Sequence, residues 1–309
     1  MNIVHVTHNP DWFHYHFTVL CRELGHAGET FHRPFYDMDE AVANSSWRDN
    51  VTYLKQFDAG FVSHLATWSR MFLQNNWDKP LFVWLYFRFD HGVSDCARYY
   101  ALLRQASKAG SIKLFAATES DKLYAQKRLG IEINIVPPVL CVNNGSKTKI
   151  PITNDQFFMV GKANEALLRS RVTVPVYHHK WADADPDLRG IRGIVHFPYA
   201  PNPRSLWENL ALGNVYFLPD LSLFQKLRRA PEYFWDSYGE DSFGFSKTVW
   251  YNEDSTKLFV HYASFEELQA LADSPSLPEL LAEKRANIQA HVKTHNLAAL
   301  KAWTGVLTV

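Results

Sequence analysis

The chain of 309 residues has no excess of charge of either sign, because 32 lysines and arginines balance 32 aspartates and glutamates. A protein that binds nucleic acid regardless of sequence needs a basic surface to displace the counterions of the phosphates, and a polybasic membrane anchor needs one as well. The balance therefore argues against nucleic acid as a partner and against an electrostatically held membrane.

Long apolar runs and cysteines are scarce as well. The longest apolar run, 81–87, falls far below the roughly 18 residues that a membrane-spanning helix requires, and it fits a buried strand. The first residues show neither the basic nor the apolar segment of a secretory signal peptide. Cys21, Cys96 and Cys141 are too few and too far apart for a disulfide framework or a metal motif. We therefore expect a cytoplasmic protein without a transmembrane segment, in a compartment that keeps thiols reduced.

The length exceeds that of one usual domain, and the hydrophobic content of 47% suffices for two cores. In the first half, short apolar strands alternate with amphipathic helices, which predicts the doubly wound parallel sheet of an α/β fold. The expected strands span 2–6, 59–63, 80–87, 112–116 and 131–136, and the expected helices span 17–24, 93–109 and 119–129, the last of these ended by Gly130.

A polar stretch over 141–154 has neither helical nor strand periodicity, which indicates a linker between a domain over 1–140 and a second one over 155–290, with a terminal helix within 291–309. The alternation restarts after the linker, so the two halves share one architecture. The expected strands are 157–160, 174–177, 193–197, 215–218, 248–251 and 258–262, and the expected helices are 165–171, 205–212, 264–271, 277–292 and 297–306, the last two separated by an interruption at 294–296.

The most informative stretch is a short helix with a serine at its start, a glutamate three residues later and a glycine at its end: Ser205, Glu208 and Gly213. A helix N-terminus presents free amide groups and a positive dipole end, which suit a phosphate. A carboxylate beside it accepts hydrogen bonds from ribose hydroxyls. The same Ser-x-x-Glu pattern is also a capping box, in which the two side chains satisfy backbone donors. The residues alone leave both interpretations open.

Two doubly wound domains, a linker and C-terminal helices resemble the GT-B glycosyltransferases, in particular the nucleotide-sugar-dependent group similar to glycosyltransferase family 4. The segment 158–162 resembles the strand that ends in Gly-Arg or Gly-Lys in that group, and 198–213 resembles its Ser-x-x-Glu segment with a closing glycine. The resemblance implies two Rossmann-like domains that face a cleft. It also implies an acceptor-side N-terminal domain, a nucleotide-sugar-binding C-terminal domain, and C-terminal helices that cross back to the N-terminal domain.

The first domain matches the same family less closely. Its 20–26 segment ends in Leu-Gly-His, 58–64 reads as aspartate, strand and histidine, and 79–91 reads as Lys-Pro, strand and histidine. Two features depart from the family pattern. Ala200 stands where the retaining branch carries the first of two glutamates, and 7–16 replaces the glycine-rich loop after the first strand.

Transfer of a glycosyl group leaves negative charge on the departing diphosphate, which an enzyme without a metal must meet with cations and a helix N-terminus. The resemblance assigns this task to Gly161, Lys162, Arg204 and Ser205, and it assigns the ribose to Glu208. We expect no cofactor apart from the nucleotide-diphosphate sugar that serves as donor. We expect no metal either, because the histidine pairs 14/16 and 178/179 lack an acidic or cysteine partner at helical spacing.

Candidate general bases follow the strands of the first domain, because open α/β sheets bind ligands at the carboxyl ends of their strands. Asp11 and Asp90 are the better bases for an inverting displacement. A retaining route needs no dedicated base, and His64 or His91 would then contact the donor sugar. We take these four residues as the catalytic candidates; His14 and His16 lie in the same loops.

Together these features predict a metal-independent glycosyltransferase that moves a hexosyl or pentosyl group from a nucleotide sugar to a hydroxyl of a glycan or another acceptor. Two alternatives remain open, a sugar-nucleotide epimerase of the same fold and a binding or scaffold domain without catalysis. A transferase that modifies DNA is disfavoured by the neutral charge.

Overall fold

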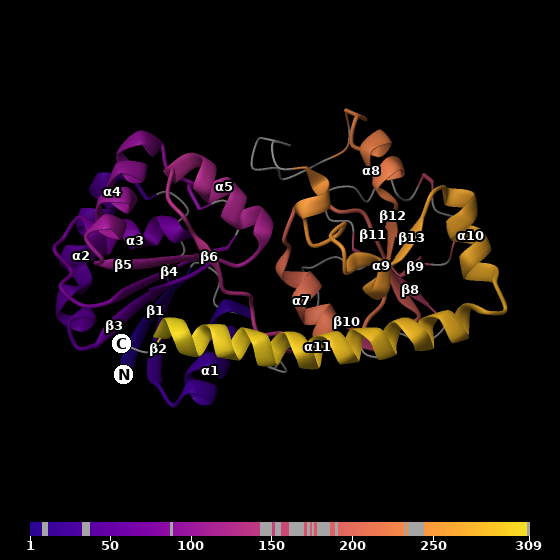
Figure 1. The fold of residues 1–309 in the computed structure, drawn as a ribbon, viewed down its shortest axis with the longest axis horizontal. Coiled ribbons are helices and arrows are strands. Elements are labelled where there is room, and N and C mark those ends of the chain that lie inside the picture. Colours follow the sequence, from indigo (N-terminus) through magenta and orange to yellow (C-terminus); the bar gives the residue numbers. More distant parts are fainter. Residues whose placement is uncertain are drawn as a thin grey trace. The chain divides into compact units, whose positions relative to one another are not determined.

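The computed structural model describes residues 1–7, 12–32, 38–86, 89–142, 150–151, 156–160, 170–171, 174, 176–177, 186–188, 191–231, 233 and 244–307. The chain forms two compact units (Figure 1). Unit 1 consists of Met1–Asn143 and Asn296–Val309, and unit 2 consists of Asn144–His295. Each unit has its own parallel sheet, as an α/β fold predicts.

Within the described part of unit 1, six parallel strands form one sheet in the order β2-β1-β3-β4-β5-β6. The strands are β1 (Asn2–Thr7), β2 (Ala27–His32), β3 (Ala59–Val62), β4 (Leu81–Leu85), β5 (Ile112–Ala116) and β6 (Asn134–Ile135); the helices are α1 (Trp12–Leu24), α2 (Glu40–Leu54), η1 (Ala66–Trp68), α3 (Ser69–Leu73), α4 (Cys96–Lys108) and α5 (Glu119–Leu129). The strand order reverses at β1, between β2 and β3. Ligands of open α/β sheets bind beside such a reversal, at the carboxyl ends of the strands.

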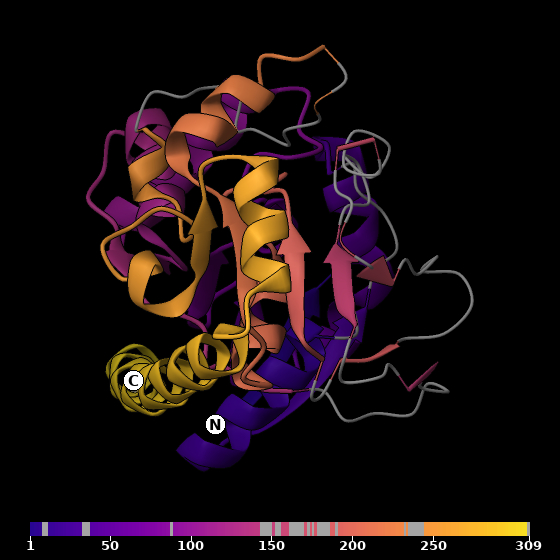
Figure 2. The same ribbon diagram turned by 90° about the vertical axis from the view of Figure 1, so that its right-hand side faces the viewer.

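The described part of unit 2 has a second parallel sheet in the order β13-β12-β11-β8-β9, which Figure 2 shows with its strands side by side. Its strands are β8 (Phe157–Val160), β9 (Val176–Tyr177), β11 (Gly193–His196), β12 (Tyr216–Pro219) and β13 (Val260–Tyr262), and a separate pair joins β7 (Ile150–Pro151) to β10 (Pro186–Asp187). The helical segments are α7 (Arg204–Ala211), α8 (Leu221–Leu227), η2 (Phe245–Lys247), α9 (Ser255–Leu258) and α10 (Phe265–Asp273). Helix α7 therefore connects the neighbouring strands β11 and β12.

The C-terminal segment is one continuous helix, α11 (Leu277–Leu307), so the predicted interruption at 294–296 is wrong. Threonine, histidine and asparagine are only moderately poor helix formers, and a tertiary contact holds the helix here. The side-chain amide of Asn296 accepts a hydrogen bond from Leu140 N at 2.7 Å and donates one to Leu140 O at 3.0 Å. Further along, the fully buried indole of Trp303 donates to Pro137 O at 2.9 Å, which anchors the helix end in unit 1.

Several predicted elements need correction. Residues 248–251 form turns after η2 instead of a strand, and the strand expected over 131–136 shrinks to β6. The prediction did not include the strands β2, β7 and β10 or the helices α2, η1, α3, α8 and α9. Strand β2 has no buried residue, so it lacks an apolar run, and α2 buries only four of its residues. Most of the helix expected over 165–171 lies outside the described residues.

Candidate functional site

Helix α7 begins at Arg204 instead of Ser205, and the residue before it is Pro203, whose side chain makes no capping hydrogen bond. The capping-box interpretation is therefore wrong, because Ser205 lies inside the first turn instead of at the N-cap. The first turn keeps the positive end of the helix dipole without a capping side chain, and Leu206 N donates to Pro203 O at 3.1 Å. Gly213 follows the helix with a φ of +77°, which confirms the predicted glycine end.

Two charged side chains lie one turn apart on this helix. The Arg204 Nε atom is 3.9 Å from Glu208 Oε2, and the two side chains are 28% and 27% exposed. Both groups therefore remain within reach of solvent. The Arg204 Nη1 atom is buried and has no hydrogen-bond partner among the residues that the structure describes. A buried donor without a partner costs free energy unless a ligand completes it.

The backbone of α7 is held in place from several sides. Ser205 O accepts hydrogen bonds from Asn209 Nδ2 at 2.8 Å and from the Tyr216 hydroxyl at 3.3 Å. The Trp207 indole donates to Asn202 Oδ1 at 2.8 Å, which ties the helix to the segment that precedes it. These contacts fix the direction of the helix axis, so its N-terminus forms a rigid, positively polarised end.

Three predicted site residues, Asp11, Gly161 and Lys162, lie outside the described residues. Their roles stay predictions.

In unit 1, the carboxyl ends of the strands carry His64, which follows β3 beside the strand reversal. Its φ of 67° is left-handed, a conformation that costs a non-glycine residue roughly 1–3 kcal/mol and that recurs at functional sites. Its ring packs at 4.7 Å from that of Phe13, on α1. The structure therefore places His64 where the sequence predicted a site residue, in a backbone conformation that the surrounding fold imposes.

A network of side-chain hydrogen bonds includes Ser63, the residue before His64. The Ser63 hydroxyl is 2.7 Å from His5 Nε2, His5 Nδ1 is 3.2 Å from the Thr30 hydroxyl, and that hydroxyl is 2.7 Å from His14 Nδ1. His5 is fully buried, and burial together with the nearby His16 and His14 lowers its pKa well below the usual value. At neutral pH His5 therefore bridges the two hydroxyls as a neutral ring. Sequence reasoning missed this network, because its members are spread over 58 positions along the sequence.

His16 belongs to the core, which argues against its inclusion among the possible bases. Its fully buried ring stacks at 4.9 Å on Trp84 and at 5.0 Å on Trp12. The Nε2 atom accepts a hydrogen bond from Val139 N at 2.9 Å, and burial lowers the pKa to about 3. A ring with this environment stabilises the packing between α1 and the sheet.

The carboxylate of Asp90 follows β4 and is buried. It accepts hydrogen bonds from the hydroxyls of Tyr100, on α4, and Tyr124, on α5, the latter at 3.0 and 3.1 Å. Burial and the bond to Asp90 raise the pKa of the Tyr100 hydroxyl. His91 is the next residue and is half-buried. Asp90, His91 and His64 therefore all follow neighbouring strands at the carboxyl edge of one sheet.

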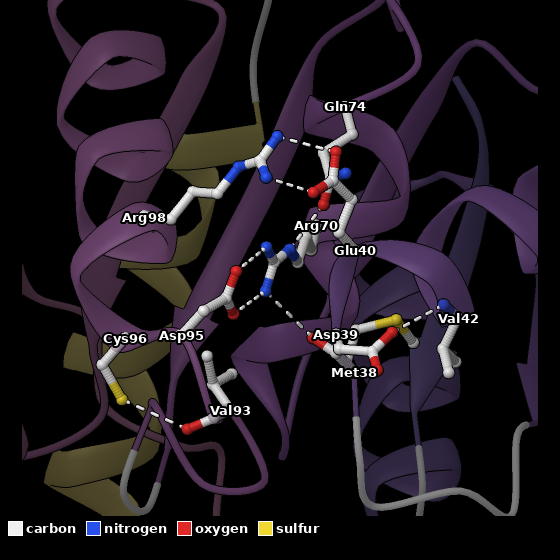
Figure 3. Close-up of polar contacts among 10 residues, drawn as sticks. All are labelled: Met38, Asp39, Glu40, Val42, Arg70, Gln74, Val93, Asp95, Cys96 and Arg98. Carbon is white, nitrogen blue, oxygen red and sulfur yellow. Dashed lines mark hydrogen bonds and ion pairs between the residues drawn. The ribbon is translucent and has the colours of Figure 1, made fainter.

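A buried arginine holds the segment that carries Asp90 and His91 (Figure 3). Arg70, on α3, is fully buried, and its two Nη atoms each donate to a carboxylate oxygen of Asp95 at 2.5 Å. It also donates to Gln74 Oε1 at 2.5 Å and to Met38 O at 3.3 Å. These bonds make Asp95 a fixed point at the start of α4.

The bond from Arg70 lowers the pKa of Asp95 and keeps that carboxyl ionised. On the other side of the segment, Met38 N donates to Gly92 O at 3.2 Å. A second ion pair, between Arg98 and Glu40, joins α4 to α2 in a more exposed position. No pattern in the sequence marks Arg70 as buried, because its partner Asp95 is 25 residues away.

The described residues contain neither a cluster of metal ligands nor a membrane-spanning helix. No three histidine, cysteine, aspartate or glutamate side chains are placed there to hold a metal ion. Within the same residues, no helix combines the length and the hydropathy needed to cross a membrane.

The fold is similar to that of a glycosyltransferase from Rickettsia africae ESF-5, with a TM-score of 0.54 and 11% sequence identity. The match covers 97% of this chain and 96% of that chain. No family model matches the sequence, and no curated protein matches it either. At this identity the similarity concerns the fold alone, and it extends over nearly the whole length of both proteins.

Proposed function

We propose that this protein is a glycosyltransferase of the GT-B arrangement that moves a glycosyl group from a nucleotide-diphosphate sugar to a hydroxyl of an acceptor, without a metal. The observation that carries the proposal is the start of α7. Its first turn has no capping side chain, a buried Arg204 nitrogen there has no partner among the described residues, and the carboxylate of Glu208 follows one turn later. The fold shared with a glycosyltransferase over nearly its full length supports it.

In this proposal the diphosphate of the donor binds at the first turn of α7. The amide groups, Arg204 and the positive end of the helix dipole would stabilise the charge that develops as the bond from the anomeric carbon to the diphosphate breaks. Gly161 and Lys162 would contact the same phosphates from the end of β8. A missing donor of this kind typically costs about 2.7–4 kcal/mol of transition-state stabilisation.

Glu208 would accept hydrogen bonds from the two hydroxyls of the ribose. To do so it must leave its contact with Arg204, which is long and partly exposed. Ion pairs of this kind contribute at most about 1 kcal/mol. Arg204 would then turn to the phosphates.

The acceptor would bind at the carboxyl edge of the sheet in unit 1. In an inverting reaction, Asp90 or Asp11 would take the proton of the acceptor hydroxyl while its oxygen bonds to the anomeric carbon. In a retaining reaction that proton would pass to the departing diphosphate, and His64 or His91 would hold the donor sugar. The left-handed backbone of His64 supports a role at this edge.

Thermal unfolding in the presence of nucleoside diphosphates and nucleotide sugars tests the proposal. A ligand at about 100 times its Kd stabilises the native state by about 2.7 kcal/mol, which raises the Tm by several degrees. We expect such a shift with at least one ribonucleoside diphosphate, and a smaller one for Glu208→Ala. Glu283→Ala, an exposed position on α11, is the matched control.

Product analysis then separates the possible activities. Nucleoside diphosphate released only when acceptor is present supports the transferase. Conversion of the donor without acceptor would indicate an epimerase instead. Binding without turnover on any acceptor would indicate a scaffold, and no shift with any nucleotide would contradict the proposed site.

A further inference from the structure

A pocket lies in unit 1 at the amino ends of the strands, opposite the ends that carry Asp90 and His64. It has a volume of about 300 Å³ and opens between the ends of α3 and α4 and the starts of β4 and β5. Leu81, the first residue of β4, lines this pocket, whereas Asp90 and His91 follow the last residue of the same strand. Because ligands of open α/β sheets bind at the carboxyl ends of the strands, the proposed glycosyl transfer does not account for this pocket.

The pocket has an apolar wall and an uncharged polar rim. None of the lining residues carries a charge. The wall is formed by Phe72, Leu73, Trp77, Leu81, Leu102, Ala106 and Ala109, and the rim by Asn76, Gln105 and Ser111. Such a lining favours an uncharged ligand, because it offers a charged group no oppositely charged side chain to replace its hydration.

The aromatic part of the wall is fixed. Trp77 is half-buried, with its ring centre 5.0 Å from that of Phe72 at an interplanar angle of 71°. Its indole nitrogen donates to Pro80 O at 3.4 Å, which holds the ring from the other end. Binding against this ring therefore requires no ordering of the aromatic side chain.

The rim offers hydrogen-bonding groups to a ligand. Asn76 and Gln105 are exposed, so their side-chain amides can reach a ligand at the mouth of the pocket. Each amide provides both donors and an acceptor. The Ser111 hydroxyl donates to Ala106 O at 3.1 Å, so its oxygen remains available as an acceptor. A ligand with both donors and acceptors around its edge fits this rim.

We propose that this pocket binds a neutral saccharide of one or two pyranose rings. A pyranose has an apolar C–H face and a rim of hydroxyls that donate and accept, which matches an apolar wall with uncharged amides around it. The volume lies at the lower end of the range of about 300–1,000 Å³ that is typical of small-molecule pockets, which limits the ligand to this size.

Saturation-transfer NMR with maltose, cellobiose, lactose and N,N′-diacetylchitobiose at millimolar concentration tests the inference, with glucuronate and cyclohexanol as comparison probes. We expect transfer to at least one neutral disaccharide and none to glucuronate. Ala106→Phe, which places a ring in the pocket, should reduce the affinity at least tenfold. Ala101→Phe, on an exposed part of α4 outside the lining, is the matched control.

Gln105→Glu is a second variant at an exposed position that packing does not constrain, and it should weaken binding of the same sugar because the amide donors are lost. The inference is overturned if no neutral disaccharide shows transfer, if neither variant changes it, or if cyclohexanol binds as well as the sugars. The nucleotide-induced Tm shift of the same samples reports on α7 separately, so each of the two sites can fail alone.

Discussion

The ion pair between Arg70 and Asp95 gives a quantitative test of how the segment with Asp90 and His91 is held. Among the described residues, the change Asp95→Ala leaves the fully buried guanidinium with Gln74 and Met38 O as its hydrogen-bond partners. Removing one partner of a buried pair costs about 3–5 kcal/mol. The Asp95 side chain is 35% exposed, so water screens part of the attraction, and we expect a loss of about 2 kcal/mol in the free energy of unfolding.

The destabilisation by Asp95→Ala should also depend on pH. Arg70 lowers the pKa of Asp95 in the folded protein, whereas the unfolded carboxyl titrates near its ordinary value. The pair therefore contributes fully above about pH 4 and is lost as the pH falls through the lower folded pKa. The difference between wild type and Asp95→Ala should be constant from pH 7 to about pH 4.5 and shrink at more acidic pH.

Urea unfolding followed by circular dichroism measures both effects. The double variant Arg70→Met/Asp95→Ala removes the buried, unpaired guanidinium as well and should be more stable than Asp95→Ala alone. Glu40→Ala breaks the exposed pair with Arg98 and should cost less than about 1 kcal/mol. If Asp95→Ala unfolds within 0.5 kcal/mol of wild type (about the scatter of neutral surface changes), the argument that this pair anchors the segment is wrong.

Three further predictions address other parts of the molecule. His16 has a pKa of about 3 in the folded protein against a usual value of 6.5, so the free energy of unfolding should decrease as the pH falls from about 6.5 to 3. In urea unfolding, His16→Phe should make this decrease shallower, and parallel profiles for variant and wild type would contradict this. Gly213→Ala, at a φ of +77°, should destabilise by about 1 kcal/mol, whereas Gly305→Ala in α11 should be neutral or stabilising; thermal unfolding distinguishes them, and equal shifts would refute the backbone argument. His64→Asn retains a residue that tolerates a positive φ, so stability should change by less than about 1 kcal/mol, while the rate of the proposed transfer should fall at least tenfold; an unchanged rate excludes a catalytic contact.

The sequence predicted the fold where local patterns and burial agree. The helix over 119–129 appears with the predicted ends, because Thr118 caps its start and Gly130 adopts a φ of 63° after it. Ser264 likewise caps α10, through a bond from Glu267 N. The edge strand β2 could not be predicted from its own residues, because it is largely exposed and forms only by pairing with β1, which is distant in the sequence.

The candidate site was less accessible to sequence reasoning. The pattern around Ser205 has two physical meanings, and only the backbone shows that Pro203 precedes the helix and that the capping box is absent. The hydrogen bonds to Asp90 come from Tyr100 and Tyr124, which lie on two later helices. No sequence pattern marks these tyrosines as its partners. Contacts of this kind depend on how the helices pack on the sheet.

Isothermal titration of a ribonucleoside diphosphate and its 2′-deoxy counterpart measures whether Glu208 binds a ribose at α7. We expect wild type to bind the ribose form at least tenfold more tightly, because a hydrogen bond to a charged carboxylate is worth about 1.5–3 kcal/mol. Glu208→Gln should lose most of this preference, while Glu283→Gln should keep it. Equal affinity for the two nucleotides in wild type, or the same preference in Glu208→Gln, would contradict the assignment of the nucleotide site to α7.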